Sequence, residues 1–565
     1  MIAGKGQFFH GKKRLREYII RDRVKKMAKL TWRDEDDVTL LEKGKKGILR
    51  VIFGRTTIVL LLLLVQFLAV FWFISFLSQY VPYVFSSILV FNAIMVVIIL
   101  NTEDIPENKL SWLVLIAIAP VVGAMLYLFV RKEVGHRRVH AALDQVDRQT
   151  DRYERWPSEL MNRLKEEDKP LENLAVYLYR NGGYPVYENT TVTYFPCGED
   201  KFDELLKQLE AAESFIFMEY FIVAEGYMWG RVLNILKRKA AEGVEVRFMY
   251  DGMCELSLLP YNYPEKLEKL GIKSRMFAPI MPFISTHYNN RDHRKIVVID
   301  GKVAFTGGIN LADEYINRKK RFGYWKDTAV MIQGDAVRSF TLMFLRMWNG
   351  ESNIRRFGVP GTALPHDDYE YYLSVEQDRH ADADGYVIPY GDTPYDGERV
   401  GEMVYLDIIN QAKRYVHIMT PYLIIDSQMI TALTYAAKRG VDVSIVLPHI
   451  PDKKYAFALA KTHYAELTRA GVKIYEFTPG FVHAKVFVSD DIRGVVGTIN
   501  LDYRSLYLHF EDGVWICRNK VVMDIKEDFV ETLHYCSPVT LEFCKNRNIF
   551  VRIMQNILRL LAPML

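Results

Sequence analysis

The chain has 565 residues and a formal net charge of +4; half of its residues are hydrophobic and 13% are aromatic. A chain of this length exceeds what one hydrophobic core supports, so two or more folded units are expected. The apolar content excludes an intrinsically disordered chain. The five cysteines are odd in number and form no CxxC pair, which argues against a disulfide framework and against a zinc site.

The chain begins with a basic arm over residues 1–55, which holds 16 Lys and Arg against 7 Asp and Glu. Arms of this kind contact anionic lipid or nucleic acid, or are solvated tails. Three uncharged apolar runs follow, at 56–77, 81–100 and 111–130. Each is long enough to cross a bilayer core of about 30 Å, so residues 56–130 are predicted to be a transmembrane region.

The charges leave the orientation of these spans open. The basic arm and the basic segment after residue 130 both favour the cytoplasm, which three crossings cannot satisfy. A first run that is re-entrant or peripheral would resolve the conflict, and we expect the catalytic part in the cytoplasm. Residues 131–185 are a predicted linker.

Residues 546–565 predict an amphipathic helix at the other end. Arg552, Gln555, Asn556 and Arg559 form one polar stripe at helical spacing, and Ile, Leu, Phe and Met fill the rest. Such a helix lies on a membrane surface or packs on the protein's own core, and the stripe fits both.

After residue 185 the pattern is α/β and occurs twice. An apolar strand, a helix, the strand "VEVRFMYDG" and a short helix ending at Gly271 are matched by a strand, a helix, "VDVSIVLP" and a helix ending at Gly471. Strands that alternate with helices predict a sheet covered by helices, and internal duplication explains the two copies. The predicted halves are 186–355 and 386–545, with a linker at 356–385.

A chemical motif repeats with the halves. "HRKIVVID" runs from His293 to Asp300, and "HAKVFVSD" runs from His483 to Asp490. In both copies a Gly-rich turn follows, and an Asn stands 17 positions after the His, at Asn310 and Asn500. Five matched positions recur by chance with a probability on the order of 10⁻⁴, so the two copies indicate one shared site.

The residues of this motif suit phosphate chemistry. On a strand, positions i and i+2 face the same side, so each His projects with its Lys. Two imidazoles, two ammonium groups and Asn amides form an anion pocket. One His can attack phosphorus while the other protonates the leaving alkoxide and then deprotonates the acceptor. This scheme requires no metal or cofactor, and the sequence shows no cluster with metal-ligand spacing.

The extended segments "HRKIVVIDGKVAFTGGIN" and "HAKVFVSDDIRGVVGTIN" resemble the two HKD motifs of the phospholipase D superfamily. Together with "MEYFI", "TPYLI", "NLADEY", "GYWKDT" and "NLDYRSLYLHFE", they make residues 80–565 similar to bacterial cardiolipin synthases of that superfamily. The resemblance implies an α/β fold with two tandem phospholipase D-like α/β/α sandwich halves packed as a pseudo-dimer, preceded by N-terminal transmembrane helices.

The resemblance also assigns roles to residues. The implied catalytic set comprises His293, Lys295, His483, Lys485 and the motif aspartates Asp300 and Asp490. Because each Asp ends an apolar strand, we expect a structural role for these two. Asn310 and Asn500 match the phosphate-binding positions, and Asp327 and Glu511 match acids that orient a histidine, with Asp327 taken as the partner of His293. His293 is the favoured nucleophile.

Two positions near the motifs stay open. Glu219 either lines the pocket or pairs with a nearby base. His509 stands where the family usually has Asn, which argues against an amide contact with phosphate from that position.

The implied reaction joins two phosphatidylglycerol molecules into cardiolipin and releases glycerol at a bacterial cell membrane. The expected partners are phosphatidylglycerol, cardiolipin and the membrane, without nucleic acid and with no expectation for the oligomeric state. A phospholipase D hydrolase or another phosphatidyltransferase would share the same residues. A nuclease of the superfamily would fit the basic arm but not the apolar runs, and an inactive membrane scaffold is disfavoured by two intact motifs.

Overall fold

A computed structural model describes residues 61, 64–72, 81–131, 134–278, 290–356, 367–545 and 549–564. The chain divides into residues 1–39 and a compact unit of residues 40–565, and the description below concerns the second. The predicted basic arm and most of the apolar run at 56–77 lie outside the described residues.

The first half is built on a seven-stranded sheet with the order β1-β8-β6-β5-β2-β3-β4. The β2, β3 and β4 strands are parallel, and the remaining neighbours are antiparallel. The strands are β1 (Thr190–Phe195), β2 (Phe215–Tyr220), β3 (Glu245–Asp251), β4 (Lys273–Phe277), β5 (Lys295–Ile299), β6 (Val303–Gly307) and β8 (Ala329–Gly334). The helices of this half are α10 (Gly198–Ala211), α11 (Tyr227–Ala241), α12 (Tyr263–Glu268), α13 (Val337–Arg356) and α14 (Tyr369–Leu373).

The second half repeats this topology. Its eight-stranded sheet has the order β19-β13-β12-β10-β15-β16-β18-β9, so each strand after β19 has a counterpart in the same relative place in the first sheet. The strands are β9 (Tyr386–Asp392), β10 (Tyr415–Met419), β12 (Asp442–Pro448), β13 (Lys473–Phe477), β15 (Val486–Ser489), β16 (Arg493–Gly497), β18 (Glu511–Cys517) and β19 (Cys536–Pro538). The helices are α15 (Val400–Gln411), α16 (Ser427–Lys438), α17 (Lys454–Ala470), α18 (Tyr503–Tyr507), α19 (Val521–Leu533) and α20 (Leu541–Lys545). The predicted duplication is confirmed.

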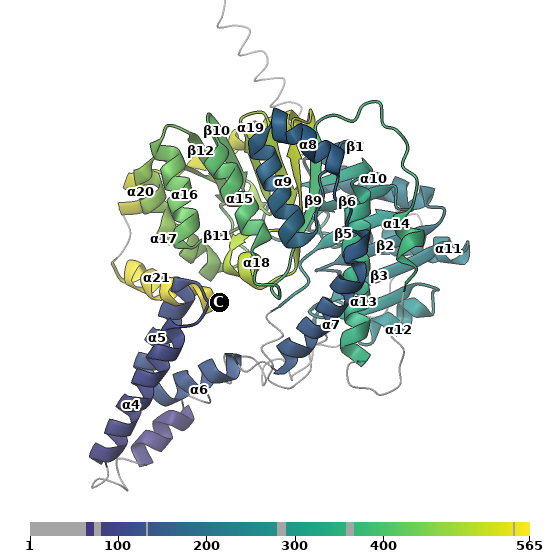
Figure 1. Ribbon diagram of the computed structural model, residues 1–565. Helices are drawn as coiled ribbons and strands as arrows, with labels where there is room; N and C mark the ends of the chain where they lie inside the picture. The colour runs from purple at the N-terminus through teal and green to yellow at the C-terminus, as the bar shows by residue number, and fades with distance from the viewer. Residues whose placement is uncertain are drawn as a thin grey trace, which may run out of the picture. The chain divides into compact units, whose positions relative to one another are not determined.

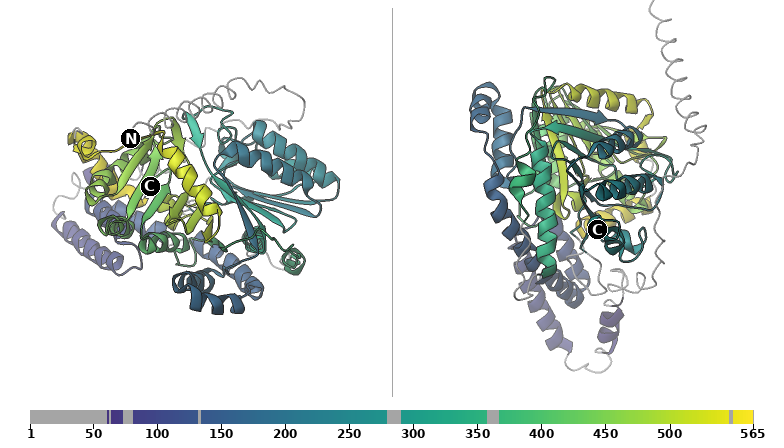
Figure 2. Two further views of the ribbon diagram at one scale, coloured as in Figure 1. Left: turned by 90° about the horizontal axis from the view of Figure 1, so that it is seen from above. Right: turned by 90° about the vertical axis from the view of Figure 1, so that its right-hand side faces the viewer.

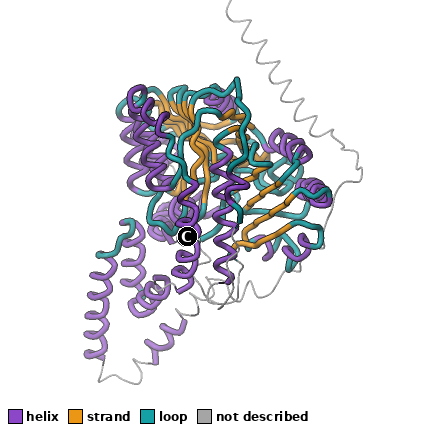
Figure 3. Tube along the Cα trace, turned by 45° about the vertical axis from the view of Figure 1, so that its right-hand side comes forward, coloured by secondary structure: helices purple, strands orange, loops and turns teal. Residues whose placement is uncertain are grey.

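Both sheets are covered on both faces, which explains their continuous apolar strands. In β2, Phe215 and Phe217 pack into a core shared by the two halves, while Ile216 and Met218 pack against α10 and α11. Figure 2 shows the two sets of strands as separate sheets, and Figure 3 shows helices flanking them. The shared core includes α13 and α19, so the halves fold against each other as the predicted pair of sandwiches.

The region predicted as a linker, 131–185, contains three helices instead: α7 (Val134–Thr150), α8 (Ser158–Glu167) and α9 (Lys169–Gly182). α9 begins with a cap in which Asp168 accepts a hydrogen bond from the backbone N–H of Leu171, and it ends at Gly183 in the left-handed conformation. Apolar side chains of α8 and α9 join the core of the second half, and α7 packs beside α13 (Figure 1). These residues therefore belong to the folded body.

The N-terminal apolar region differs from the prediction. The run at 81–100 coincides with α4 (Val81–Leu100), but the run at 111–130 is broken into α5 (Pro106–Ile118) and α6 (Pro120–Arg131). Pro120 explains the break, because proline has no N–H to donate and clashes with the preceding turn. Among the helices that the structure describes, none is long and apolar enough to span a bilayer. The predicted transmembrane helices are therefore not confirmed.

The last helix, α21 (Ile549–Leu561), contacts both α17 and α5 (Figure 1). Its Gln555 is buried, Arg559 lies 3.6 Å from Glu466, and Ser111 donates a hydrogen bond to the carbonyl of Leu560. Of the polar stripe, Gln555 and Arg559 thus contact the protein, whereas Arg552 and Asn556 are exposed. The apolar side chains of the opposite face are exposed: Ile549, Phe550, Ile553, Met554, Ile557 and Leu560.

Candidate active site

The two HKD segments meet at the junction of the halves. His293 lies just before β5, and His483 lies between β14 (Gly480–Val482) and β15. The prediction that each His is part of a strand is therefore wrong. The strand β14 pairs in parallel with β7 (Tyr324–Lys326) of the first half. A separate bridge joins Asp292 to Phe510. The first contact places Lys326 of the first half beside the second motif, and the other places Phe510 of the second half beside the first motif.

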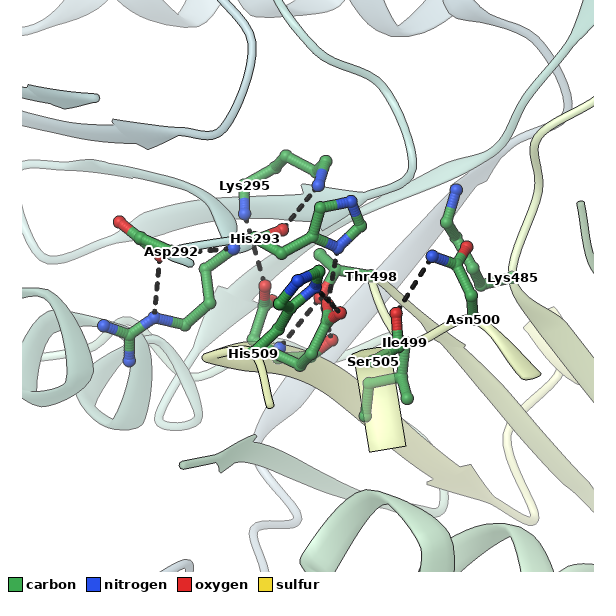
Figure 4. A network of polar contacts seen from close by, with 12 residues as sticks. Asp292, His293, Lys295, Lys485, Thr498, Ile499, Asn500, Ser505 and His509 are labelled. Atoms are coloured by element: carbon green, nitrogen blue, oxygen red, sulfur yellow. Dashed lines mark hydrogen bonds and ion pairs between the residues drawn. The ribbon is translucent and has the colours of Figure 1, made fainter. Parts of the chain in front are cut away.

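His293 receives its carboxylate partner from the second half. Its Nδ1 lies 2.8 Å from Glu511 Oε2, within hydrogen-bonding distance (Figure 4). The backbone N–H of His293 donates to the carbonyl of Phe510, which fixes the chain beside β18. Thr498 donates a further hydrogen bond to Glu511 Oε2. The imidazole is held through Nδ1, so its Nε2 is left for chemistry.

His483 has the mirror arrangement with the first half. Its Nδ1 lies 2.7 Å from Asp327 Oδ2, and its backbone N–H donates to the carbonyl of Lys326. The other oxygen of Asp327 accepts from the backbone N–H of Thr328, and Trp325 Nε1 lies 3.4 Å from Oδ2. Asp327 is thus held on both oxygens.

The predicted pairing of Asp327 with His293 is therefore wrong. Each acid contacts the histidine of the opposite half, because β7 runs beside β14 and Phe510 bridges to Asp292. The acids follow their own motifs in sequence by 34 and 28 residues, by subtraction of the numbers in the sequence. Sequence spacing alone does not reveal which of two nearly symmetric histidines such a residue reaches.

The two lysines lie against the histidines as the shared spacing predicts. Lys295 donates to the carbonyl of His293. Lys485 donates to the carbonyl of His483, and its Nζ lies 2.9 Å from Nδ1 and 3.1 Å from Nε2 of that ring. Burial lowers the pKa of Lys295 to about 8 and that of Lys485 to about 7, against the opposing pull of nearby carboxylates. Burial thus disfavours the ammonium form of both lysines, and a bound anion would favour it.

The histidines and their acids differ in charge state. Burial and then Lys295 lower the pKa of His293 well below its usual value; burial and then Lys485 lower that of His483 to about 4. Burial opposes ionisation of Asp327, but the charges of His483 and Lys485 outweigh it and lower its pKa. For Glu511, burial dominates and raises the pKa well above its usual value. The Asp327 side of the site therefore supports a positive imidazole better.

The motif aspartates do not face this pocket. Asp300 follows β5 at a positive φ of 53°, and Asp490 follows β15 at 58°. Asp300 accepts from the backbone N–H groups of 213–215, and Asp490 accepts from those of 413–415. They anchor the starts of β2 and β10, which agrees with the structural role expected and not with the catalytic set of the motif.

The two Asn residues are engaged locally. Asn310 accepts from the backbone N–H of Ile222 and donates to Tyr315 Oη at 2.8 Å. Asn500 donates to Ser505 Oγ at 2.9 Å, and its Oδ1 has no hydrogen-bond partner among the described residues (Figure 4). Phosphate binding by either amide remains a prediction; each amide nitrogen carries two hydrogens and uses only one of them in these contacts.

Glu219 pairs with a base. It is fully buried, and its Oε1 accepts from Arg294 Nε at 2.7 Å. Arg294 stands between His293 and Lys295 and points to the other side of the chain, where it also lies 3.6 Å from Asp292. Of the two interpretations of Glu219, the structure supports the ion pair.

Three aromatic rings, to which the sequence assigned no role, pack against the histidines. Phe221 packs 4.8 Å from the His293 ring, while Trp325 and Tyr315 lie 5.3 Å and 5.5 Å from the His483 ring. All three were visible in the quoted segments "MEYFI", "NLADEY" and "GYWKDT". Their contacts with His293 and His483 could not be predicted from the sequence, because these contacts form only when the chain folds.

His509, His293 and Glu511 form a buried cluster that could hold a metal ion. The sequence showed no such cluster, because residue 293 lies more than 200 positions from the other two. The prediction that the chemistry needs no metal is not tested by this geometry.

A two-half α/β fold that brings one His–Lys pair from each half to a common junction defines a phospholipase D-like protein. The sequence profile described as "Cardiolipin synthase, PLD-like domain" matches residues 205–348 and 405–533, and a profile described as "Phospholipase_D-nuclease N-terminal" matches residues 90–132.

Similar proteins cover most of the chain. A "Cardiolipin synthase" of Geobacillus sp. (strain WCH70) is 34% identical over 81% of this chain and 89% of its own length. An uncharacterized protein of Streptococcus mutans is 52% identical over 83% of this chain and 99% of its own length. The chain belongs to the cardiolipin synthase family, a family of phospholipase D-like enzymes.

Among solved structures, phosphatidylserine synthase of Haemophilus influenzae Rd KW20 is similar with a TM-score of 0.51. The similarity covers 70% of this chain and 100% of that one at 13% identity, and it supports the fold alone.

Proposed function

We propose that this enzyme transfers a phosphatidyl group from one phosphatidylglycerol to the hydroxyl of another, making cardiolipin and glycerol through a phosphohistidine intermediate. The observation that carries the proposal is the pair of crossed His–carboxylate contacts at one lysine-rich junction. Family membership supports the choice of lipid. Both lysines would neutralise the non-bridging oxygens of the phosphodiester.

In the first step, His293 is the nucleophile. Its Nδ1–H donates to Glu511, so Nε2 carries the lone pair that attacks phosphorus. The bond from phosphorus to the glycerol oxygen breaks. His483 protonates this oxygen, and ionised Asp327 stabilises the imidazolium that does so.

In the second step, neutral His483 takes the proton of the acceptor hydroxyl. The oxygen attacks phosphorus and the phosphorus–nitrogen bond to His293 breaks, which restores both residues. Burial lowers the pKa of His483 to about 4, and a bound phosphodiester would raise it because its negative charge would lie among the buried cations. Substrate binding therefore prepares the acid.

We also infer that the enzyme works at a bacterial cell membrane. α21 contacts the protein through Gln555 and Arg559 and leaves large apolar side chains exposed, among them Phe550 and Met554. α4 likewise exposes apolar side chains, including Leu89, Val90 and Ile94. Apolar surface of this extent is typical of a membrane or protein contact, and a diacyl substrate favours the membrane.

Two other reactions fit the same residues. A hydrolase would use water as acceptor and release phosphatidic acid, and another phosphatidyltransferase would use a different alcohol. Both reactions differ from cardiolipin synthesis only in the acceptor of the second step, and no feature of the described residues identifies that acceptor.

The test is an assay of the purified full chain in detergent with phosphatidylglycerol labelled in its headgroup glycerol. We expect labelled cardiolipin and free labelled glycerol, and we expect either His293→Ala or His483→Ala to lower the rate by at least ~10³-fold. His449→Ala, a half-exposed histidine paired with Glu476, is the matched control. Phosphatidic acid without cardiolipin would replace the synthase with the hydrolase.

A further inference from the structure

The proposed transfer leaves a third histidine unused. His509 lies beside His293 with the ring centroids 5.5 Å apart, and its Nδ1 is 3.7 Å from Glu511 Oε1 (Figure 4). One candidate ligand atom from each of His293, His509 and Glu511 lies within 4.8 Å of the others. The three side chains thus bring their candidate ligand atoms close together at the junction of the halves.

Three atoms in this cluster make no hydrogen bond within the described part of the chain. They are both ring nitrogens of His509 and Oε1 of Glu511, although the His509 side chain is only 10% exposed and that of Glu511 is 0% exposed. Buried polar groups nearly always have partners, so these atoms indicate an occupant. Two imidazoles and a carboxylate offer lone pairs, which suits a cation or a hydrogen-bonding water.

We propose that His293, His509 and Glu511 form a zinc site, and that zinc bound there inhibits the enzyme. Two His nitrogens and a carboxylate oxygen are ligands that zinc takes at about 2.0–2.2 Å. The ligand atoms need to approach one another by roughly 1 Å for tetrahedral bonding. His509 can supply this movement, because no hydrogen bond among the described residues holds its ring.

The inhibition follows from which groups the ion occupies. Zinc would take the one lone pair of the neutral His293 ring: bound at Nδ1 it displaces the contact with Glu511 and leaves the ring proton on Nε2, and bound at Nε2 it occupies the attacking atom. Attack on phosphorus is blocked in either case. Lys295 and Lys485 are close enough to act electrostatically on His293 and oppose any cation. Mg²⁺ and Ca²⁺ prefer oxygen ligands and are therefore excluded, whereas zinc has the affinity for nitrogen that the site requires.

The experiment compares the full chain with His509→Asn, which removes one ligand and keeps a polar side chain. Zinc binding to chelator-treated protein is measured by calorimetry without substrate, and cardiolipin synthesis is measured with zinc, with Mg²⁺ and with chelator. We expect one zinc per chain that His509→Asn binds at least about 100-fold more weakly. Zinc should slow the full chain, relative to its own metal-free rate, far more than the variant, and Mg²⁺ should slow neither. His449→Asn is the matched control for a surface histidine.

Each result decides the question. Absence of zinc binding would assign the unpaired atoms to water and overturn the proposal, as would equal binding or equal inhibition of the two proteins. Zinc that binds without slowing turnover would contradict the inhibitory role. The inhibition rests on the proposed transfer, whereas the binding does not. If the chain binds zinc at this site but makes no cardiolipin, the proposed function is refuted and the proposed zinc site still stands.

Discussion

At the residue scale, the two carboxylates that hold the histidines are not equivalent. Asp327 is anchored by Thr328 and His483, and its pKa is lowered, so it is an anion at neutral pH. Within the described part of the chain, one oxygen of Glu511 has no hydrogen-bond partner, and burial raises the pKa of this acid. The negative charge that favours an imidazolium is therefore at His483, which suits the acid, while His293 stays neutral, which suits the nucleophile.

This asymmetry predicts unequal effects of amide substitutions. Asp327→Asn removes the charge beside His483 and should lower kcat by ~10²- to 10⁴-fold. Glu511→Gln keeps an oxygen that accepts the Nδ1–H of His293 and should lower kcat by less than about tenfold. Steady-state rates with phosphatidylglycerol measure both, and Asp335→Asn, which pairs with Asn189 outside the site, is the control. A larger loss in Glu511→Gln would contradict the assignment of the acid and the nucleophile.

At the element scale, short strands and single helices determine where the site and its surface lie. β7 and β14 have only three residues each, yet their pairing brings Asp327 to His483. Gly480 permits this pairing, because a Cβ there would lie 2.1 Å from the carbonyl oxygen of Tyr324. The helix α21 adds an apolar area to the outer surface, because most of its large apolar side chains are exposed.

The proposed orientation of α21 predicts contact with lipid. In Ile553→Trp the new indole should be quenched by brominated lipids in phosphatidylglycerol vesicles, relative to the emission of the unsubstituted chain. Val530→Trp on α19, where the side chain is 42% exposed, is the matched control and should not be quenched. Equal quenching in both variants, or none in Ile553→Trp, would show that α21 does not lie on the bilayer.

At the scale of the whole molecule, the sequence predicted the duplication and the two His–Lys pairs well. The repeat was readable because the motif, its spacing and the strand order recur in each half. The crossing of Asp327 and Glu511 was not readable, since it depends on contacts between residues 156 and 218 positions apart. Pro120, at which the helix breaks, was visible in the sequence. The prediction used only run length and charge, and neither takes account of a proline.

In the proposed mechanism the two halves share one phosphate, with His293 as nucleophile and His483 as acid and base. A phosphatidyl ester of p-nitrophenol tests this mechanism most directly, because this leaving group departs without protonation. In His483→Ala the first step should proceed and the second should stall for lack of a base. Mass spectrometry of an alkaline digest should then find the phosphatidyl group on His293. An adduct on His483 in His293→Ala, or no adduct in either variant, would contradict the mechanism.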